Sequence, residues 1–124
     1  MTFTYEVIDH VQIAAPVGGE DKAREYYHEK LGFEEVEKPD LLKKNGGVWF
    51  QAGSVHIHIG LEDPFTPAEK AHPAIRVKDI GALKRHLDEV GVEYLADDRL
   101  PGADRFYAAD PFGNRIEFLE WINE

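Results

Sequence analysis

The chain has 124 residues and a mass of 14.1 kDa, which suits one domain of ordinary size and is too short for two. It is 43% hydrophobic and 31% charged, as soluble globular proteins are, and its 14 basic and 24 acidic residues leave a net charge of −10. This acidity argues against a general nucleic-acid binder and against attraction to anionic lipid, and the lack of cysteine excludes disulfides and thiolate metal sites. No apolar run approaches the roughly 20 residues of a membrane span, and the acidic opening lacks the apolar core of a signal peptide. We therefore expect a cytoplasmic protein whose partners are small molecules or metal ions.

The first half of the chain predicts a strand, a helix and three further strands. Residues 7–15 are typical of a strand that Pro16 closes, and residues 20–31 of a helix that ends at Gly32. Strand-like runs follow in FEEVEK, VWFQA and SVHIHIGL, with a loop through Pro39 and Asp40 after the first of them. Residues 62–71 contain two prolines and several charges, and are expected to be a linker.

The same order of elements then begins again. Residues 72–77 predict a strand, Asp79 is suited to cap a helix over 80–90, and Gly91 ends it. Strands are expected in VEYLA, RFYAAD and NRIEFLEW, and the turn at 110–113 is interpreted as structural rather than catalytic. The pattern predicts a single domain over 6–122, made of a module at 6–61, the linker at 62–71 and a module at 72–122.

The spacing of polar residues supports an internal repeat. His10 and His72 each open the first strand of a module and lie 62 residues apart (72 − 10 = 62). From the helix to the final strand the offset is 59, which matches His58 with Glu117 (117 − 58 = 59) without a gap. The two halves of the chain are therefore predicted to fold alike.

Alternation along the strands predicts that polar groups collect on one face of each sheet. Side chains i and i+2 share a face, so residues such as Ile13 and Ile57 would pack under the helices. The opposite faces carry a set of possible metal ligands, namely His10, His56, His58, His72 and Glu117. Imidazole and carboxylate groups are natural ligands of Zn²⁺, Fe²⁺, Mn²⁺, Ni²⁺ or Co²⁺. The gap-free match with Glu117 favours His58 over His56, but either could be the ligand.

Other side chains are candidates for substrate binding, and none is assigned a catalytic role. Arg76 suits an anionic group of a substrate or an ion pair with an acidic residue, and Gln12 can hydrogen-bond a metal ligand. Trp49 and Tyr107 suit the core or a pocket wall. The full set of candidates is Gln12, His56, Arg76, Trp49 and Tyr107. In contrast, His28 and His86 fall within the predicted helices and are expected to be solvated.

Five segments of the chain resemble a known family. They are IDHVQIAAP (8–16), YYHEKLGFEEV (26–36), VHIHIG (55–60), AHPAIRV (71–77) and DPFGNRIEF (110–118). On these segments the chain resembles the vicinal oxygen chelate superfamily, which is the glyoxalase/bleomycin-resistance/dioxygenase group. The resemblance implies an α+β fold of two βαβββ modules that form a half-open curved sheet, with the helices on its outer face. It also implies a homodimer.

The resemblance further implies one divalent metal ion (Zn, Ni, Mn, Fe or Co), whose ligands fall on His10, His58, His72 and Glu117. We therefore expect a metal-dependent enzyme that binds a small substrate through two neighbouring oxygens. In glyoxalase I-like members the position of His58 is usually a glutamate that removes a proton, and a metal-bound imidazole takes that proton poorly, which argues against lactoylglutathione lyase activity. The alternative is a metal-free protein of the bleomycin-resistance type that binds a cationic drug. Whether the ligands come from one or two subunits stays open.

Overall fold

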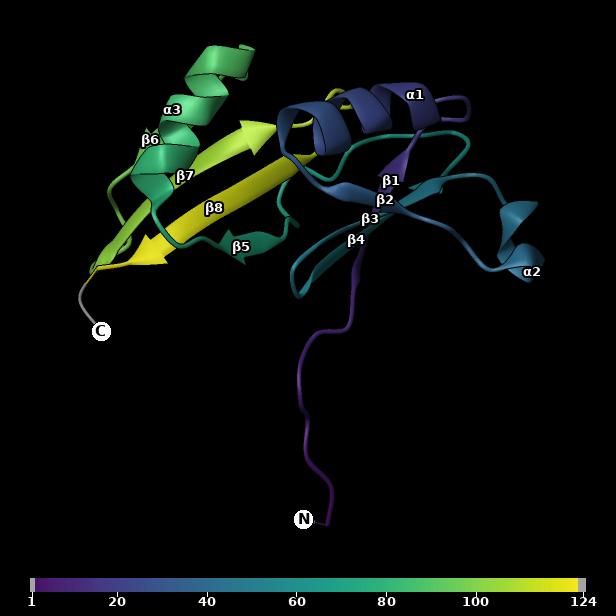
Figure 1. The fold of residues 1–124 in the computed structure, drawn as a ribbon, viewed down its shortest axis with the longest axis horizontal. Helices are drawn as coiled ribbons and strands as arrows, with labels where there is room; N and C mark the ends of the chain where they lie inside the picture. The colour runs from purple at the N-terminus through teal and green to yellow at the C-terminus, as the bar shows by residue number, and fades with distance from the viewer. Residues whose placement is uncertain (1, 123–124) are drawn as a thin grey trace.

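The computed structural model describes residues 2–122, and in them two modules repeat one order of elements (Figure 1). The first contains β1 (Val11–Ala15), α1 (Glu20–Ala23), η1 (Arg24–Lys30), β2 (Glu34–Val36), α2 (Asp40–Lys43), β3 (Val48–Ala52) and β4 (Val55–Leu61). The second contains β5 (Ala74–Arg76), α3 (Ile80–Val90), β6 (Leu95–Asp97), β7 (Ala103–Ala109) and β8 (Arg115–Trp121). The predicted α+β fold of two βαβββ modules is confirmed. No helix within residues 2–122 is long and apolar enough to cross a membrane.

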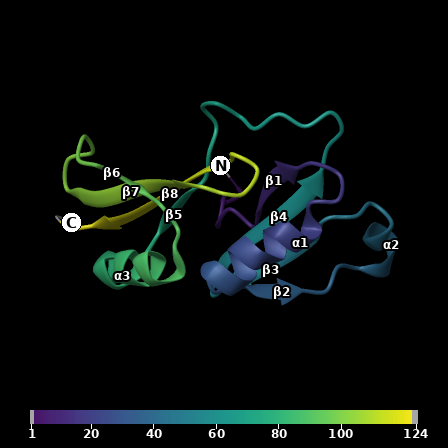
Figure 2. The same cartoon turned by 90° about the horizontal axis from the view of Figure 1, so that it is seen from above.

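Each module forms a four-stranded mixed sheet, with the strand orders β1-β4-β3-β2 and β5-β8-β7-β6. The first and last strands of each module run parallel, so that Gln12 lies opposite His58, and Ala74 opposite Glu117. These pairs reproduce the predicted offsets of 62 (74 − 12) and 59 (117 − 58). The strands are hydrogen-bonded within each module only, so the expected curved sheet consists of two sheets that lie side by side (Figure 2).

The opening strands are shorter than predicted. β1 begins at Val11 rather than at residue 7, and β5 covers 74–76 rather than 72–77. His10 and His72 therefore precede the strands that they were expected to open. Before Val11 the chain leaves the edge of β4, and Pro73 lacks the N–H group that a strand ladder needs. The predicted loop through Pro39 contains the short helix α2.

The longer helices begin and end close to the predicted residues. α1 and η1 together cover 20–30, and η1 has π-helical hydrogen bonding for which the sequence offered no signal. α3 covers the predicted 80–90, where Asp79 Oδ1 accepts a hydrogen bond from the Ala82 N–H at 3.2 Å. Gly91 then ends α3 with a φ of 76°, a left-handed conformation that glycine adopts without strain.

Most of the side chains that alternation assigned to the core are buried, whereas Val11, Val55, Ile75 and Val77 are only half-buried. Ile13, Ile57, Ile59, Ile116 and Phe118 are each 6% exposed or less. They belong to one hydrophobic cluster that contains residues of both modules. Figure 2 shows α1 lying over β3 and β4, which is the face that this cluster fills in the first module.

A buried polar cluster joins the two modules. Asp110, in the turn between β7 and β8, accepts hydrogen bonds from the Tyr27 hydroxyl of η1 at 2.7 Å and from the Asn114 amide at 2.9 Å. The Asn114 amide also donates to the Ala14 carbonyl of β1 at 2.8 Å. Asp110 and Asn114 are 5% and 8% exposed, and burial, together with the Asp110 charge, raises the pKa of Tyr27 well above its usual value. The turn predicted to be structural therefore fastens the second module to the first.

We expect Asn114→Ala to lower the free energy of unfolding by about 1–3 kcal/mol, because it leaves the Ala14 carbonyl without its side-chain donor and removes one of the two hydrogen bonds to Asp110 Oδ2. Urea denaturation followed by circular dichroism measures this loss. Glu89→Ala, at an exposed position of α3, is the control and is expected to change stability by less than about 0.5 kcal/mol. Equal losses of unfolding free energy in the two variants would contradict the conclusion that the Asn114 hydrogen bonds hold the modules together.

Candidate functional site

The first pair of predicted ligands, His10 and His58, belongs to a stack of three rings. The His58 imidazole lies between the Trp49 indole and the His10 imidazole, at centroid distances of 3.8 and 4.1 Å and interplanar angles of 4° and 16°. Trp49 and His58 are register partners in β3 and β4, so the sheet itself sets this contact. Burial, followed by the charges of His10 and His56, lowers the pKa of His58. A neutral imidazole, which metal binding requires, is thereby favoured.

His10 is oriented by the residue that precedes it. His10 Nδ1 lies 3.0 Å from Asp9 Oδ2, and this hydrogen bond lowers the pKa of Asp9. An imidazole that donates from Nδ1 keeps the lone pair of Nε2 for a ligand. Because the rings of His10 and His58 are stacked, their nitrogens lie in nearly parallel planes and do not aim at one point. The His10 side chain, which is 44% exposed, must therefore turn before both imidazoles can bind one ion.

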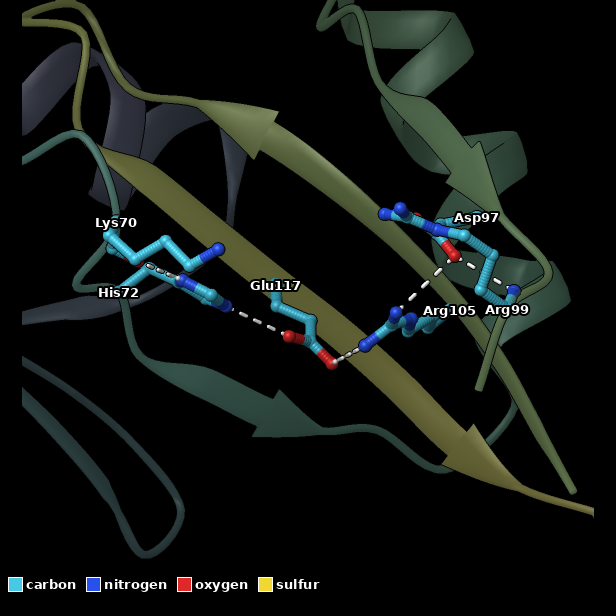
Figure 3. A network of polar contacts seen from close by, with 6 residues as sticks. All are labelled: Lys70, His72, Asp97, Arg99, Arg105 and Glu117. Carbon is cyan, nitrogen blue, oxygen red and sulfur yellow. Dashed lines mark hydrogen bonds and ion pairs between the residues drawn. The ribbon is translucent and has the colours of Figure 1, made fainter. Parts of the chain in front are cut away.

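The second pair of predicted ligands, His72 and Glu117, is in direct contact (Figure 3). His72 Nε2 lies 2.9 Å from Glu117 Oε1, and His72 Nδ1 lies 2.8 Å from the Lys70 carbonyl oxygen. Both ring nitrogens thus face oxygen acceptors, whereas a neutral imidazole has a single N–H to donate. A cation at Nε2, either a proton or a metal ion, resolves this mismatch. The donors of this pair therefore fit a metal ion.

A chain of charged side chains holds Glu117 in place (Figure 3). Glu117 Oε2 accepts a hydrogen bond from Arg105 Nη1 at 3.3 Å, and Arg105 Nη2 donates to Asp97 Oδ1, also at 3.3 Å. Asp97 accepts a further hydrogen bond from Arg99 Nε at 2.9 Å. These bonds, the one from Arg99 first, lower the pKa of Asp97. Because Arg105 holds one oxygen of Glu117, the other oxygen stays directed at His72.

Two arginines that sequence reasoning missed lie beside the second pair. The ring of Tyr107 meets the His72 ring edge to face at a centroid distance of 5.7 Å. The guanidinium carbons of Arg105 and Arg115 lie 5.4 and 5.3 Å from the centroid of the same Tyr107 ring. Arg115 stands two residues before Glu117 in β8, so the two-residue period of strands was the signal that could have found it.

The remaining predicted residues lie around a groove and two smaller hollows. His56 and Arg76 both line a groove of about 560 Å³ between the edges of the two sheets. Trp49 lines a hollow of about 320 Å³ beside His58. The Gln12 side chain packs against Gly60, and a Cβ atom added to Gly60 would lie 2.8 Å from Gln12 Nε2. Gln12 also borders a separate hollow of about 200 Å³.

The four predicted ligands occur as two pairs, one in each module. Within residues 2–122, no group of three or more His, Cys, Asp or Glu side chains is placed to hold a metal ion. His28 and His86 lie outside both pairs; they are exposed, as expected, and contact the carbonyl groups of Phe33 and Lys30.

A family model matches most of the chain. The Glyoxalase/Bleomycin resistance protein/Dioxygenase superfamily model aligns with residues 7–118. The chain belongs to this superfamily. The resemblance that the five sequence segments carried is thereby confirmed.

Other proteins of the glyoxalase superfamily share the fold. A solved structure described as a glyoxalase family protein, from Bacillus anthracis, is 51% identical with a TM-score of 0.93, and the match covers 98% of this chain and 99% of that one. Another so described, from Enterococcus faecalis, is 28% identical with a TM-score of 0.74, over 94% of this chain and 98% of that one. A curated relative, Glyoxylase I 4 of Arabidopsis thaliana, is 25% identical over 107 residues, or 78% of this chain. The match spans 62% of the length of that relative.

The lowered pKa of Asp97 predicts a pH dependence of stability. A carboxyl group whose pKa is lower in the folded protein adds stability above its unfolded pKa of about 3.9, and loses this contribution as the pH falls through the folded value. We therefore expect Asp97→Asn to be less stable than the wild type at about pH 7, and the difference to shrink at about pH 3. Urea unfolding at both pH values measures it, with Asp98→Asn at the exposed neighbouring position as control. A difference of the same size at both pH values would show that the charge of Asp97 is not its cause.

Proposed function

We propose that this chain forms a metal-dependent enzyme of the glyoxalase/dioxygenase type, which binds a small substrate through two neighbouring oxygens. One observation carries the proposal. The repeat-equivalent histidines are oriented alike, because Nδ1 of His10 faces the Asp9 carboxylate and Nδ1 of His72 faces the Lys70 carbonyl. Histidine ligands of metals almost always donate their second N–H to a carboxylate, a backbone carbonyl or water.

The proposed ligands are His10 and His58 from one copy of the chain, and His72 and Glu117 from a second copy. Support for a homodimer comes from the pairwise grouping, since the described residues of one chain gather no more than two of these side chains. Three imidazoles and one carboxylate suit Zn²⁺, Ni²⁺, Mn²⁺, Fe²⁺ or Co²⁺. Such an ion, when bound, supplies a Lewis acid that holds and polarises two oxygens of a substrate.

The protein's own residues contribute orientation. The Asp9 carboxylate sets the direction of the His10 ring, and Arg105 restrains one oxygen of Glu117. Glu117 is 6% exposed, so its carboxylate is held in a poorly solvated place where pairing with cations is favoured. These supports are the kind that hold metal ligands in a productive direction.

Elemental analysis of protein purified without a nickel column tests the metal proposal. We expect about one divalent ion per subunit in the wild type, and its loss in His72→Ala, because that variant removes one of the four ligands. His86→Ala is the matched control, since it removes an exposed histidine of α3 that lies outside both pairs. Absence of metal after incubation with Zn²⁺, Ni²⁺, Mn²⁺ and Fe²⁺ would contradict the enzyme and support the metal-free binding protein instead.

The charges around the second pair favour an anionic substrate. The two arginines drawn in Figure 3 are paired with carboxylates, whereas Arg115 forms no ion pair within residues 2–122. Its guanidinium lies over Tyr107, whose ring contacts His72. In a chain with a net charge of −10, a positive group without an ion pair among the described residues therefore lies close to His72, a proposed ligand. The Arg115 guanidinium and the proposed metal ion would both attract a carboxylate or phosphoryl group.

We expect Arg115→Ala to weaken the binding of oxalate, an anion with neighbouring oxygens, by about tenfold, with the metal content unchanged. Isothermal titration of the metal-loaded protein measures the affinity, and neutral catechol serves as the uncharged probe. Arg85→Ala, at an exposed position of α3, is the control and should bind oxalate as the wild type does. Equal weakening for oxalate and catechol would rule out recognition of charge by Arg115.

A further inference from the structure

Residues 2–9 form an extended arm that leaves the body of the protein just before His10 and β1 (Figure 1). The arm carries large apolar side chains that are exposed: Phe3 is 56%, Tyr5 88%, Val7 79% and Ile8 75% accessible to solvent. Phe3, Tyr5 and Val7 alternate with Thr4 and Glu6, as they would in a strand that has one apolar face. An apolar face of this length is costly to leave in water, which indicates that something covers it.

The arm joins the body of the protein beside the groove that lies between the two sheets. The groove has a volume of about 560 Å³, and Ile8 lines it at the arm's own end. Its walls combine polar residues with apolar side chains from four strands and from the residue after β5, namely Val11, Val55, Ile57, Ile75, Val77 and Trp121. On one side runs β5, which is the edge strand of its sheet and pairs with β8 alone. A free strand edge beside apolar side chains is a surface that accepts an extended segment.

The charges of the arm and of the groove are complementary. The arm carries Glu6 and Asp9 and no basic residue, whereas Lys78 lines the groove. The groove also contains Glu120, but its two carboxylate oxygens accept hydrogen bonds from the backbone N–H groups of Asp79 and Ile80. The groove therefore presents the Lys78 ammonium group to an occupant, and the arm offers it acidic groups.

We propose that the arm of each copy lies in the groove of a second copy of this chain, and that the exchange is reciprocal. The arm points away from both modules of its own chain, so its apolar face reaches a neighbour rather than its own groove (Figure 1). Reciprocal exchange gives a closed two-fold dimer, in which each groove is filled once. The exchange deepens the proposed function, which rests on a second copy. His10 follows the arm directly, so the contact that seats the arm also sets where His10 meets the other copy.

Because the chain has no cysteine, introduced thiols report the contact directly. We expect Glu6→Cys in one chain and Lys78→Cys in another to form a mixed disulfide dimer when the two proteins are refolded together and oxidised. Glu29→Cys, at an exposed position of η1, replaces Lys78→Cys in the control and should give no mixed dimer. A variant that carries both cysteines in one chain completes the test. The proposal is overturned if this variant closes its disulfide within one chain, or if Glu6→Cys in the mixture links only to itself.

A second experiment tests the dimer without introduced cysteines. We expect Tyr5→Ser combined with Val7→Ser to weaken the dimer by about 100-fold or more, as judged by light scattering of the full chain across a dilution series. Leu41→Ser is the matched control, because this side chain of α2 is 85% exposed but lies outside the arm. A dimer unaffected by the arm substitutions overturns the exchange.

The two proposals fail separately. If the arm variants stay dimeric and bind metal, arm exchange is wrong and the proposed function stands. If the wild-type protein binds no metal but the arm variants become monomeric, arm exchange stands and the proposed function is wrong.

Discussion

The buried contact between Asp110 and Asn114 is the constraint on which the rest of the structure depends. Asn114 begins the approach to β8, and its amide reaches the Ala14 carbonyl in β1, so the contact joins the two strands that lead to His10 and Glu117. Tyr27 completes it from η1. The Asp110 carboxylate accepts hydrogen bonds from its own turn, and docking of the two modules adds the one from Tyr27. Burying these polar groups without their partners would be costly. The modules are thus held together by hydrogen bonds as well as by their shared apolar cluster.

The two modules share one strand register but differ in the side chains that surround the candidate ligands. Trp49 lies opposite His58 in the first module, and Tyr107 lies opposite Glu117 in the second, so an aromatic ring accompanies the candidate ligand in both. In the first module the neighbouring groups are rings, which stack with one another. In the second they are arginines, which pair with carboxylates. The same scaffold therefore surrounds the candidate ligands with aromatic rings in the first module and with ion pairs in the second.

Much of this could be predicted from the sequence. The gap-free offset between His58 and Glu117 predicted equivalent strand positions, and the strand pairing shows them. Asp79 and Gly91 predicted the bounds of α3, because caps depend on neighbours a few residues away. The role of Arg105 could not be predicted in this way, because its partners Asp97 and Glu117 are brought to it by strand pairing.

The sequence by itself determined the repeat, the faces of the strands and the donor types at the candidate site, since these follow from alternation and from the chemistry of single side chains. Tertiary structure alone decided that His10 stacks on His58, that Glu117 is held between His72 and Arg105, and that residues 2–9 extend away from the body. These features depend on how far a strand stays paired and on which distant side chains then meet. Such outcomes are set by the packing of the whole chain, and no local pattern encodes them.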